Sequence, residues 1–276
     1  MSNVKNTGIL YLVPTPIGNL ADMTYRGVLV LKEVDLIYAE DTRTSGILLA
    51  HYDIKTSLKS YHKFNEKERC EEIIGHLRVG KNIAIISDAG TPGIADPSNI
   101  VVKEVISEGF QINPLPGATA LIPALVSSGF DTQQFYMAGF LPSKKQQKEK
   151  LLSKLKAFDI PIVFYEAPHR LEKFLHEIKD FFNNADVCIA RELTKLYESF
   201  YRGKLYDILE NFDSIVLKGE FVIVVIPEKV KIELKEEVLD LYHNKYKDEK
   251  VAKASRLIAE ELGVSKNRVY EVLIKM

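Results

Sequence analysis

The sequence predicts a protein of the α/β class, and three observations carry this prediction. Short apolar runs alternate with amphipathic helical stretches over most of the chain. Some runs, such as 83–87 (IAIIS), are apolar almost throughout, as expected of strands that are buried on both faces of a parallel sheet. Loops rich in glycine and proline follow several of the runs, where the strands of such a sheet would end.

In the first half, each expected strand is an apolar run bounded by turn residues, and the stretches between the runs have helical patterns. The expected strands are 9–13, 34–39, 83–87 and 110–115. The expected helices are 22–33, 43–51, 66–79, 97–108 and 118–127. Strands that alternate with helices in this way favour a mostly parallel sheet.

A second series of elements follows with a different texture. Its expected strands are 134–140, 161–165, 186–191 and 221–226, and its expected helices are 145–157 and 169–182. We therefore expect two α/β domains, 1–118 and 119–228. A chain of 276 residues agrees with this division, because one domain typically takes ~100–200 residues.

Residues 229–276 form a charged linker followed by two amphipathic stretches. Gly263, Val264 and Ser265 separate these stretches, and Ser265 is suited to capping the second helix. This is the helix–turn–helix pattern. A helical hairpin that only packs against the body or a partner subunit is the alternative.

The charge balance excludes a strongly basic protein. Lys and Arg number 37 and Asp and Glu 38, so a nucleic-acid partner would need a local basic patch. Residues 144–156 contain six lysines and one acid, Glu149, although a solvated helix face is the plainer interpretation of such a run.

Several other classes of protein and site are also disfavoured. Cys70 and Cys188 are too few for a disulfide framework, and no metal-ligand spacing occurs, so we expect no metal. The glycine fingerprints of dinucleotide and P-loop sites are absent. No signal peptide or membrane span is evident, so we expect a cytoplasmic protein without membrane contact.

Three loops follow expected strands of the first half: 14–20 (PTPIGNL), 88–97 (DAGTPGIADP) and 116–119 (PGAT). In open α/β sheets, ligands bind outside the carboxyl ends of the strands. Glycine lets a backbone approach a ligand closely, and proline restricts the shape of the loop. The three loops together predict a ligand site.

The same loops carry a resemblance to a known family. The runs VPTPIGNLADMTYRGVLVLKEVDLIYAEDTRTSGILL, SDAGTPGIADPS, PLPGATALIPAL, FYEAPHR and KGEFVIVV resemble the bacterial small-subunit ribosomal RNA ribose methyltransferases of the tetrapyrrole methylase superfamily. The resemblance covers about residues 8–227. It implies two α/β domains with S-adenosylmethionine (AdoMet) in the cleft between them. It also implies a homodimer that methylates the ribose 2′-hydroxyl of a cytidine in the decoding centre of 16S rRNA, within the small ribosomal subunit.

The resemblance also suggests which residues hold the cofactor. Thr91 stands where many relatives have an aspartate, so Asp88 or Asp96 is the candidate for that charge. Tyr165 and Glu166 are expected to face the same cleft from the second domain. The expected cofactor positions are Pro16, Gly18, Asp88, Gly90, Thr91, Gly93, Ile94, Ala95, Thr119, Ala120 and Tyr165.

A ribose hydroxyl is a poor nucleophile near neutral pH, so a general base would help the transfer. The candidate bases are Glu40, Asp41 and Glu166, and capping of a strand end beside Arg43 is the alternative role for the first two. The candidate RNA-binding residues are Arg43, Lys144, Lys145, Lys148, His169 and Arg170, for which surface ion pairing is the alternative.

Overall fold

The computed structural model describes residues 7–96, 98–228 and 234–275. The chain forms two compact units, and both contain a five-stranded sheet with helices, which confirms the α/β class. The first unit comprises residues 1–127 together with 190–200, and the second comprises 128–189 together with 201–276. The division expected after residue 118 therefore falls inside the first unit.

The sheet of the first unit is wholly parallel and has the strand order β3-β2-β4-β1-β5. Its strands are β1 (Ile9–Val13), β2 (Leu36–Ala39), β3 (Leu58–Ser60), β4 (Ile83–Ile86) and β5 (Gln111–Pro114). Every residue of β2 and β4 is buried, because these strands lie inside the sheet and are covered on both faces. The sequence did not predict β3, which is a short edge strand.

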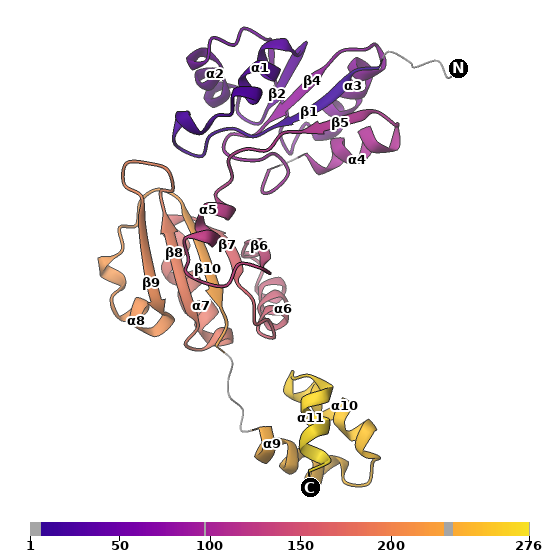
Figure 1. Ribbon diagram of the computed structural model, residues 1–276, viewed down its shortest axis with the longest axis vertical. Helices are drawn as coiled ribbons and strands as arrows, with labels where there is room; N and C mark the ends of the chain where they lie inside the picture. Colours follow the sequence, from indigo (N-terminus) through magenta and orange to yellow (C-terminus); the bar gives the residue numbers. More distant parts are fainter. Residues whose placement is uncertain (1–6, 97, 229–233, 276) are drawn as a thin grey trace. The chain divides into compact units, whose positions relative to one another are not determined.

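Helices cover both faces of this sheet (Figure 1). On one face, Ala84 and Ile86 of β4 pack beneath α1 (Tyr25–Glu33) and α2 (Thr42–His51). On the other face, Ile83 and Ile85 pack beneath α3 (Glu66–Arg78) and α4 (Asn99–Ser107). Alternation along β4 thus supplies two apolar cores from one strand. The short elements η1 (Leu20–Asp22) and α5 (Leu121–Val126) complete the unit.

An ion-pair cluster connects the edge strand β3 to α3. Glu72 of α3 accepts hydrogen bonds from Lys59 of β3 and from Arg69 one turn earlier. Burial alone would raise the pKa of Glu72, but these two cationic donors lower it to about 2. The carboxylate therefore stays ionised over the physiological range and ties strand to helix.

The second unit has a mixed sheet of order β6-β7-β10-β8-β9. Its strands are β6 (Tyr136–Phe140), β7 (Ile162–Glu166), β8 (Asp186–Arg191), β9 (Ser199–Lys204) and β10 (Phe221–Ile226). β7 runs parallel to β6 and antiparallel to β10. The helices are α6 (Lys145–Leu155), α7 (Leu171–Phe182) and α8 (Leu205–Glu210), with two turns of 3₁₀ helix, η2 (Pro168–Arg170) and η3 (Phe212–Ser214).

The apolar stripe of α7 anchors the core of the second unit. Its buried residues are Leu171, Phe174, Leu175, Ile178 and Phe182, which recur every three or four positions on one face. Phe174 meets Phe164 of β7 edge to face, with ring centroids 5.1 Å apart.

The C-terminal residues fold as a small helical group. It contains α9 (Leu234–Leu241), the π-helical turn η4 (Tyr242–Tyr246), α10 (Val251–Leu262) and α11 (Lys266–Leu273). Gly263 ends α10 in the left-handed conformation at φ 66°, and the Ser265 hydroxyl accepts from the Arg268 amide to cap α11. The expected helical pair is therefore present, while linker residues 229–233 lie outside the described residues. Among the described helices, none has the length and apolarity needed to cross a membrane.

Candidate functional site

The loops that follow β1 and β4 are joined by a pair of backbone hydrogen bonds. The Thr15 amide donates to the Gly90 carbonyl and the Gly90 amide donates to the Thr15 carbonyl, both at 2.9 Å. Side chains reinforce the junction, since the buried Thr15 hydroxyl donates to the Ser87 carbonyl at 2.9 Å and the Ser87 hydroxyl donates to the Gly90 carbonyl at 2.8 Å. The loops after β1 and β4 therefore form one rigid surface, which we call the loop floor.

The loop after β5 joins the same floor. The Thr91 hydroxyl donates to the Ala118 carbonyl at 2.9 Å. Gly117 lies so close to Pro14 that a Cβ atom on Gly117 would stand 2.6 Å from the proline Cβ. Gly90, at φ +85°, lies under Ala118 and Thr119, and a Cβ there would meet the Ala118 carbonyl at 3.7 Å. Because β4, β1 and β5 are neighbours in the sheet, their carboxyl ends bring the three loops together.

Ten of the eleven expected cofactor residues lie in these three loops or at their ends. They are Pro16, Gly18, Asp88, Gly90, Thr91, Gly93, Ile94, Ala95, Thr119 and Ala120. Thr91 uses its hydroxyl proton to join two of the loops, which is a structural role that the sequence did not suggest. Tyr165 belongs to β7 of the second unit, where its ring packs against Phe140 with centroids 5.7 Å apart.

Three acidic side chains gather beside this floor. Glu40 follows β2, Asp88 follows β4, and Asp96 lies further along the same loop. Burial, and after it the charge of Asp88, raises the pKa of Glu40, while His62 opposes the shift. Burial, and after it the charges of Glu40 and Asp88, raises the pKa of Asp96 to about 6. Carboxylates this close together form an electronegative site, which suits a cationic ligand.

Asp41 differs from its neighbour Glu40, because it caps α2. Its carboxylate accepts from the Arg43 amide at 2.8 Å and from the Arg43 guanidinium at 2.7 Å. These hydrogen bonds lower the pKa of Asp41 to about 2, so it is a weak base. The Asp41 amide in turn donates to the Asp88 carboxylate at 3.0 Å, which connects the loops after β2 and β4. Of these two acids, Glu40 is the better candidate for a general base.

Tyr165 and Glu166, both expected to face the cofactor cleft, do not lie on the same face of their sheet. Adjacent residues of a strand point to opposite faces of the sheet, and Glu166 is on the face of Phe164, which packs in the helix-covered core. The Glu166 side chain is fully buried, accepts from the Ala167 amide at 2.9 Å and forms an ion pair with Arg170, whose Nε lies 3.2 Å away. Burial raises the pKa of Glu166, and these two donors oppose the shift.

Arg170, an expected RNA contact, is held inside the second unit. Besides its ion pair with Glu166, it donates from Nη2 to the Leu141 carbonyl at 3.0 Å, which joins η2 to the loop after β6. Arg170 is therefore ion-paired, as the alternative to RNA binding supposed, but its partner Glu166 is buried and not on the surface. His169 lies beside them in η2 and is exposed.

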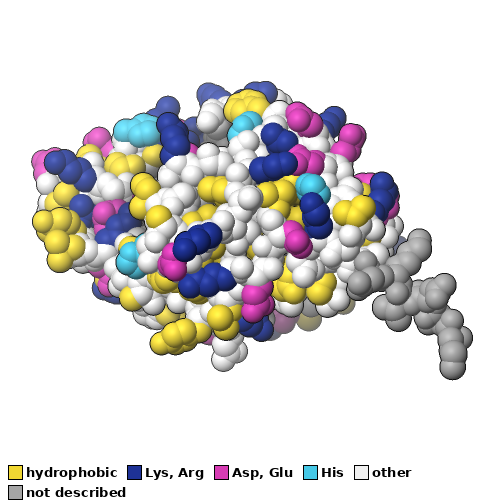
Figure 2. Space-filling view, turned by 90° about the horizontal axis from the view of Figure 1, so that it is seen from above, with side chains coloured by type: hydrophobic (Ala, Val, Ile, Leu, Met, Phe, Trp, Pro, Cys, Tyr) yellow, Lys and Arg dark blue, Asp and Glu magenta, His cyan; other side chains and the backbone are white. Residues whose placement is uncertain are grey.

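The basic segment of α6 is only partly available to a partner. Lys144 and Lys145 begin the helix and are exposed, and Lys145 lies 3.8 Å from Glu149. Lys148 differs from them, because it pairs with Glu177 of α7 and its side chain is only 15% exposed. The structure therefore does not support Lys148 as an RNA contact. On the face that Figure 2 shows, Lys and Arg side chains are interspersed with acidic and apolar ones.

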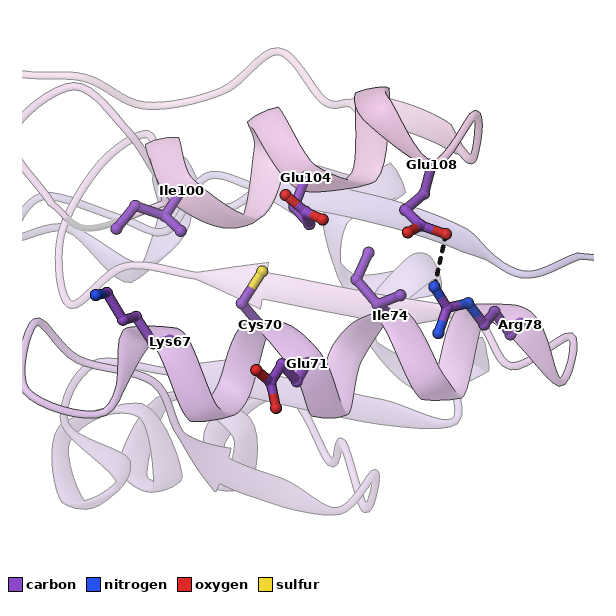
Figure 3. A pocket seen from close by; sticks show the side chains of 8 residues that line it. All are labelled: Lys67, Cys70, Glu71, Ile74, Arg78, Ile100, Glu104 and Glu108. Carbon is purple, nitrogen blue, oxygen red and sulfur yellow. Dashed lines mark hydrogen bonds and ion pairs between the residues drawn. The ribbon is translucent and has the colours of Figure 1, made fainter.

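A groove of about 510 Å³ lies between α3 and α4 of the first unit, apart from the three loops (Figure 3). Its lining residues are Lys67, Cys70, Glu71, Ile74, Arg78, Ile100, Glu104 and Glu108. An ion pair between Arg78 and Glu108, 2.7 Å apart, spans one end. Burial, and after it the charge of Glu104, raises the pKa of Cys70, so this thiol is a poor nucleophile. The groove contains none of the expected site residues.

Comparison with known proteins identifies the family. Residues 9–209 match the family described as Tetrapyrrole (Corrin/Porphyrin) Methylases. The chain belongs to the tetrapyrrole methylase family. It is therefore a methyltransferase, and the site at the ends of β1, β4 and β5 belongs to a tetrapyrrole methylase.

Curated relatives match this tetrapyrrole methylase over most of its length. It is 42% identical to Ribosomal RNA small subunit methyltransferase I of Synechocystis sp., over 98% of both chains. It is 46% identical to the protein of the same name from Bacillus subtilis, over 80% of this chain and 76% of the relative.

Solved structures confirm the fold. Diphthine synthase superposes with a TM-score of 0.65 at 14% identity, over 80% of this chain and 91% of that one. Uroporphyrin-III C-methyl transferase from Thermus thermophilus, complexed with S-adenyl homocysteine, superposes with a TM-score of 0.55 at 16% identity, over 79% of this chain and 97% of that one. At these identities the likeness concerns the fold alone.

Proposed function

We propose that this tetrapyrrole methylase transfers a methyl group to the ribose 2′-hydroxyl of a cytidine in the decoding centre of 16S rRNA. The observation that carries the proposal is the 42% identity to a ribosomal RNA small subunit methyltransferase I over nearly the whole chain. The loop floor and the acidic side chains beside it supply a place for the reaction.

The cofactor of the enzyme is AdoMet, which supplies an activated methyl group when bound. The residues of the first unit fit this molecule, which carries a sulfonium and an ammonium group. Glu40, Asp88 and Asp96 form an electronegative site that suits both cations. Gly90 and Gly117 let the three loops approach one another without side chains between them. We propose that the loop residues named above line the cofactor site.

Methyl transfer to a hydroxyl needs positioning and the removal of one proton. We propose that Glu40 accepts this proton, because its raised pKa makes it a stronger base than an ordinary glutamate. Asp88 contributes to that raised pKa through its charge. Asp41 holds the start of α2, and through the hydrogen bond from its amide it orients Asp88.

The rRNA substrate requires contacts to phosphates, which position a nucleic acid without reading its sequence. Arg43 is the strongest candidate in the first unit, because its side chain is 89% exposed. Lys144, Lys145 and His169 are the candidates in the second unit. We propose that the substrate is 16S rRNA within the small subunit, that the enzyme acts as a homodimer, and that it works in the cytoplasm.

Mass spectrometry of 16S rRNA tests the target. A strain without the gene should lack one ribose methyl group, on a cytidine of the decoding centre. Wild-type protein supplied in trans should restore it, and a Glu40→Gln variant expressed at the same level should not. An unchanged modification map in the deletion strain would reject rRNA as the substrate. It would favour a small tetrapyrrole-like molecule as the methyl acceptor.

A further inference from the structure

The segment that follows β8 is held in a strained conformation. Two of its residues that are not glycine, Glu192 and Thr194, have φ of 53° and 67°, in the left-handed region. Hydrogen bonds enforce this shape, because the Lys195 amide donates to the Glu192 carbonyl at 3.0 Å and the Thr194 amide donates to the Glu198 carboxylate at 2.7 Å. Strain that the surrounding structure maintains in this way occurs most often at functional sites.

The strained segment places Lys195 on the first of the three loops. A Cβ atom on Gly18 would lie 2.4 Å from Lys195 Cγ and 2.7 Å from its Cε, so the aliphatic chain of Lys195 lies directly against the Gly18 backbone. Residues 190–200 and Gly18 belong to the same compact unit. Gly18 is three residues beyond Thr15, whose backbone pairs with Gly90. The Lys195 side chain therefore borders the loop floor.

An ion pair with Glu192 holds the ammonium group of Lys195 in place. Its Nζ lies 2.8 Å from Glu192 Oε1, and the two side chains are only 28% and 16% exposed. A partly buried cation on a glycine of a ligand-binding loop can attract an anion strongly, because solvent screens it less than a surface lysine. The sequence alone does not mark this residue, because nothing local in RELTK relates it to a loop about 180 positions earlier.

The charges of the first unit complement a zwitterion. Glu40, Asp88 and Asp96 suit the sulfonium and the ammonium group of AdoMet, but they repel its carboxylate. Lys195 supplies the opposite charge beside Gly18 of the same floor. We propose that Lys195 binds the carboxylate of AdoMet and so fixes the methionine end of the cofactor. The proposal uses the cofactor of this family and does not depend on which RNA atom is methylated.

Calorimetry with two ligands tests this assignment. The probes are AdoMet and decarboxylated AdoMet, which lacks only the carboxylate. Lys195→Met keeps the aliphatic chain over Gly18 and removes the charge. We expect it to weaken AdoMet binding about tenfold, the effect of one charge-assisted hydrogen bond, and to leave the affinity for decarboxylated AdoMet within twofold of wild type. Lys195→Arg should retain most of the affinity for AdoMet.

One control variant and the comparison of the two ligands make the outcomes distinct. Lys103→Met removes an exposed lysine from α4 and should change neither affinity. Equal weakening of both ligands by Lys195→Met would mean that the residue only packs against the loop, and this would overturn the proposal. Unchanged AdoMet affinity with a raised KM for rRNA would also overturn it, in favour of a phosphate contact. If the rRNA assignment is wrong, the wild-type protein will bind AdoMet but will not methylate rRNA. This result differs from both outcomes that overturn the role of Lys195.

Discussion

Gly117 is the position where the packing of the three loops can be tested most directly. The substitution Gly117→Ala adds one methyl group, whose carbon would lie 2.6 Å from Pro14 Cβ and 2.9 Å from Pro14 Cγ. Gly117 has no positive φ, so alanine meets no backbone penalty there and the steric contact acts alone. The proline cannot rotate away, because its ring is closed onto its own backbone nitrogen.

The geometry sets the expected magnitude. Ordinary contact begins near 3.4 Å, so the two loops must separate by about 0.8 Å from the 2.6 Å approach. Overpacking of this kind costs about 1–3 kcal/mol, and a displacement near 1 Å in a reacting site can cost about 100-fold in rate. We expect Gly117→Ala to weaken AdoMet binding by about 10-fold or more and to lower the free energy of unfolding by about 1 kcal/mol.

Calorimetry with AdoMet and urea unfolding measure the two effects. Gly75→Ala is the matched control, because Gly75 is an exposed position within α3 where a Cβ atom meets nothing within 4 Å. That variant should gain about 0.5–1 kcal/mol of stability from helix propensity and keep wild-type affinity. Wild-type AdoMet affinity in Gly117→Ala would refute the view that the contact between Pro14 and Gly117 shapes the cofactor site.

Three further predictions concern the base, the ion-pair cluster and the basic helix. Glu40→Gln should lower kcat about 10²–10⁴-fold in single-turnover methylation at saturating AdoMet. Asp88 helps to raise the pKa of Glu40, so Asp88→Asn should lower that pKa and move the acid limb of the pH profile of kcat to lower pH. An acid limb that does not move would contradict the role of Glu40 as the general base. The pKa of Glu72 falls from 4.5 to about 2 on folding, so its ionised form stabilises the fold above the unfolded pKa and this stability is lost as the pH falls. Glu72→Gln should therefore lower the free energy of unfolding in urea by about 2 kcal/mol at pH 7, allowing for partial exposure, and by progressively less from about pH 5 to about pH 3. A loss of stability that does not depend on pH would indicate that Glu72 acts through packing. The double variant Lys144→Gln, Lys145→Gln should weaken rRNA binding and reduce the slope of log affinity against log salt concentration by about two. Lys148→Met should leave this slope unchanged, because Lys148 pairs with Glu177. Equal slopes in both variants would mean that Lys144 and Lys145 face solvent and do not contact rRNA.

The interior strands show what local pattern can predict. β1, β2 and β4 lie inside the first sheet, and each coincides with an expected apolar run to within about two residues at each end, because a strand covered on both faces needs mainly apolar residues. Two of the four edge strands, β3 and β9, were not predicted, whereas the edge strands β5 and β6 were. β3 has only three residues, and β9 (SFYRGK) lacks a continuous apolar run, so their pairing with a neighbour defines them more than their own composition does.

The site shows a similar division. Glycines, prolines and acids at the ends of strands were visible in the sequence, and they lie where the sequence predicted. The separate roles of Glu40 and Asp41, adjacent in the chain, were not visible. Their pKa values shift in opposite directions, because Glu40 is partly buried beside Asp88 and Asp41 accepts hydrogen bonds from Arg43.

By itself, then, the sequence determined the α/β class, most of the helices and strands, the family resemblance and the three loops. These features depend on residues close together in the chain, whose spacing and chemistry can be read directly. Only the tertiary structure decided that β4, β1 and β5 are neighbours, that Arg170 and Lys148 are held by internal ion pairs, and that Lys195 lies on Gly18. Each of these depends on contacts between residues far apart in the chain or in different elements, which the packing of the whole unit selects.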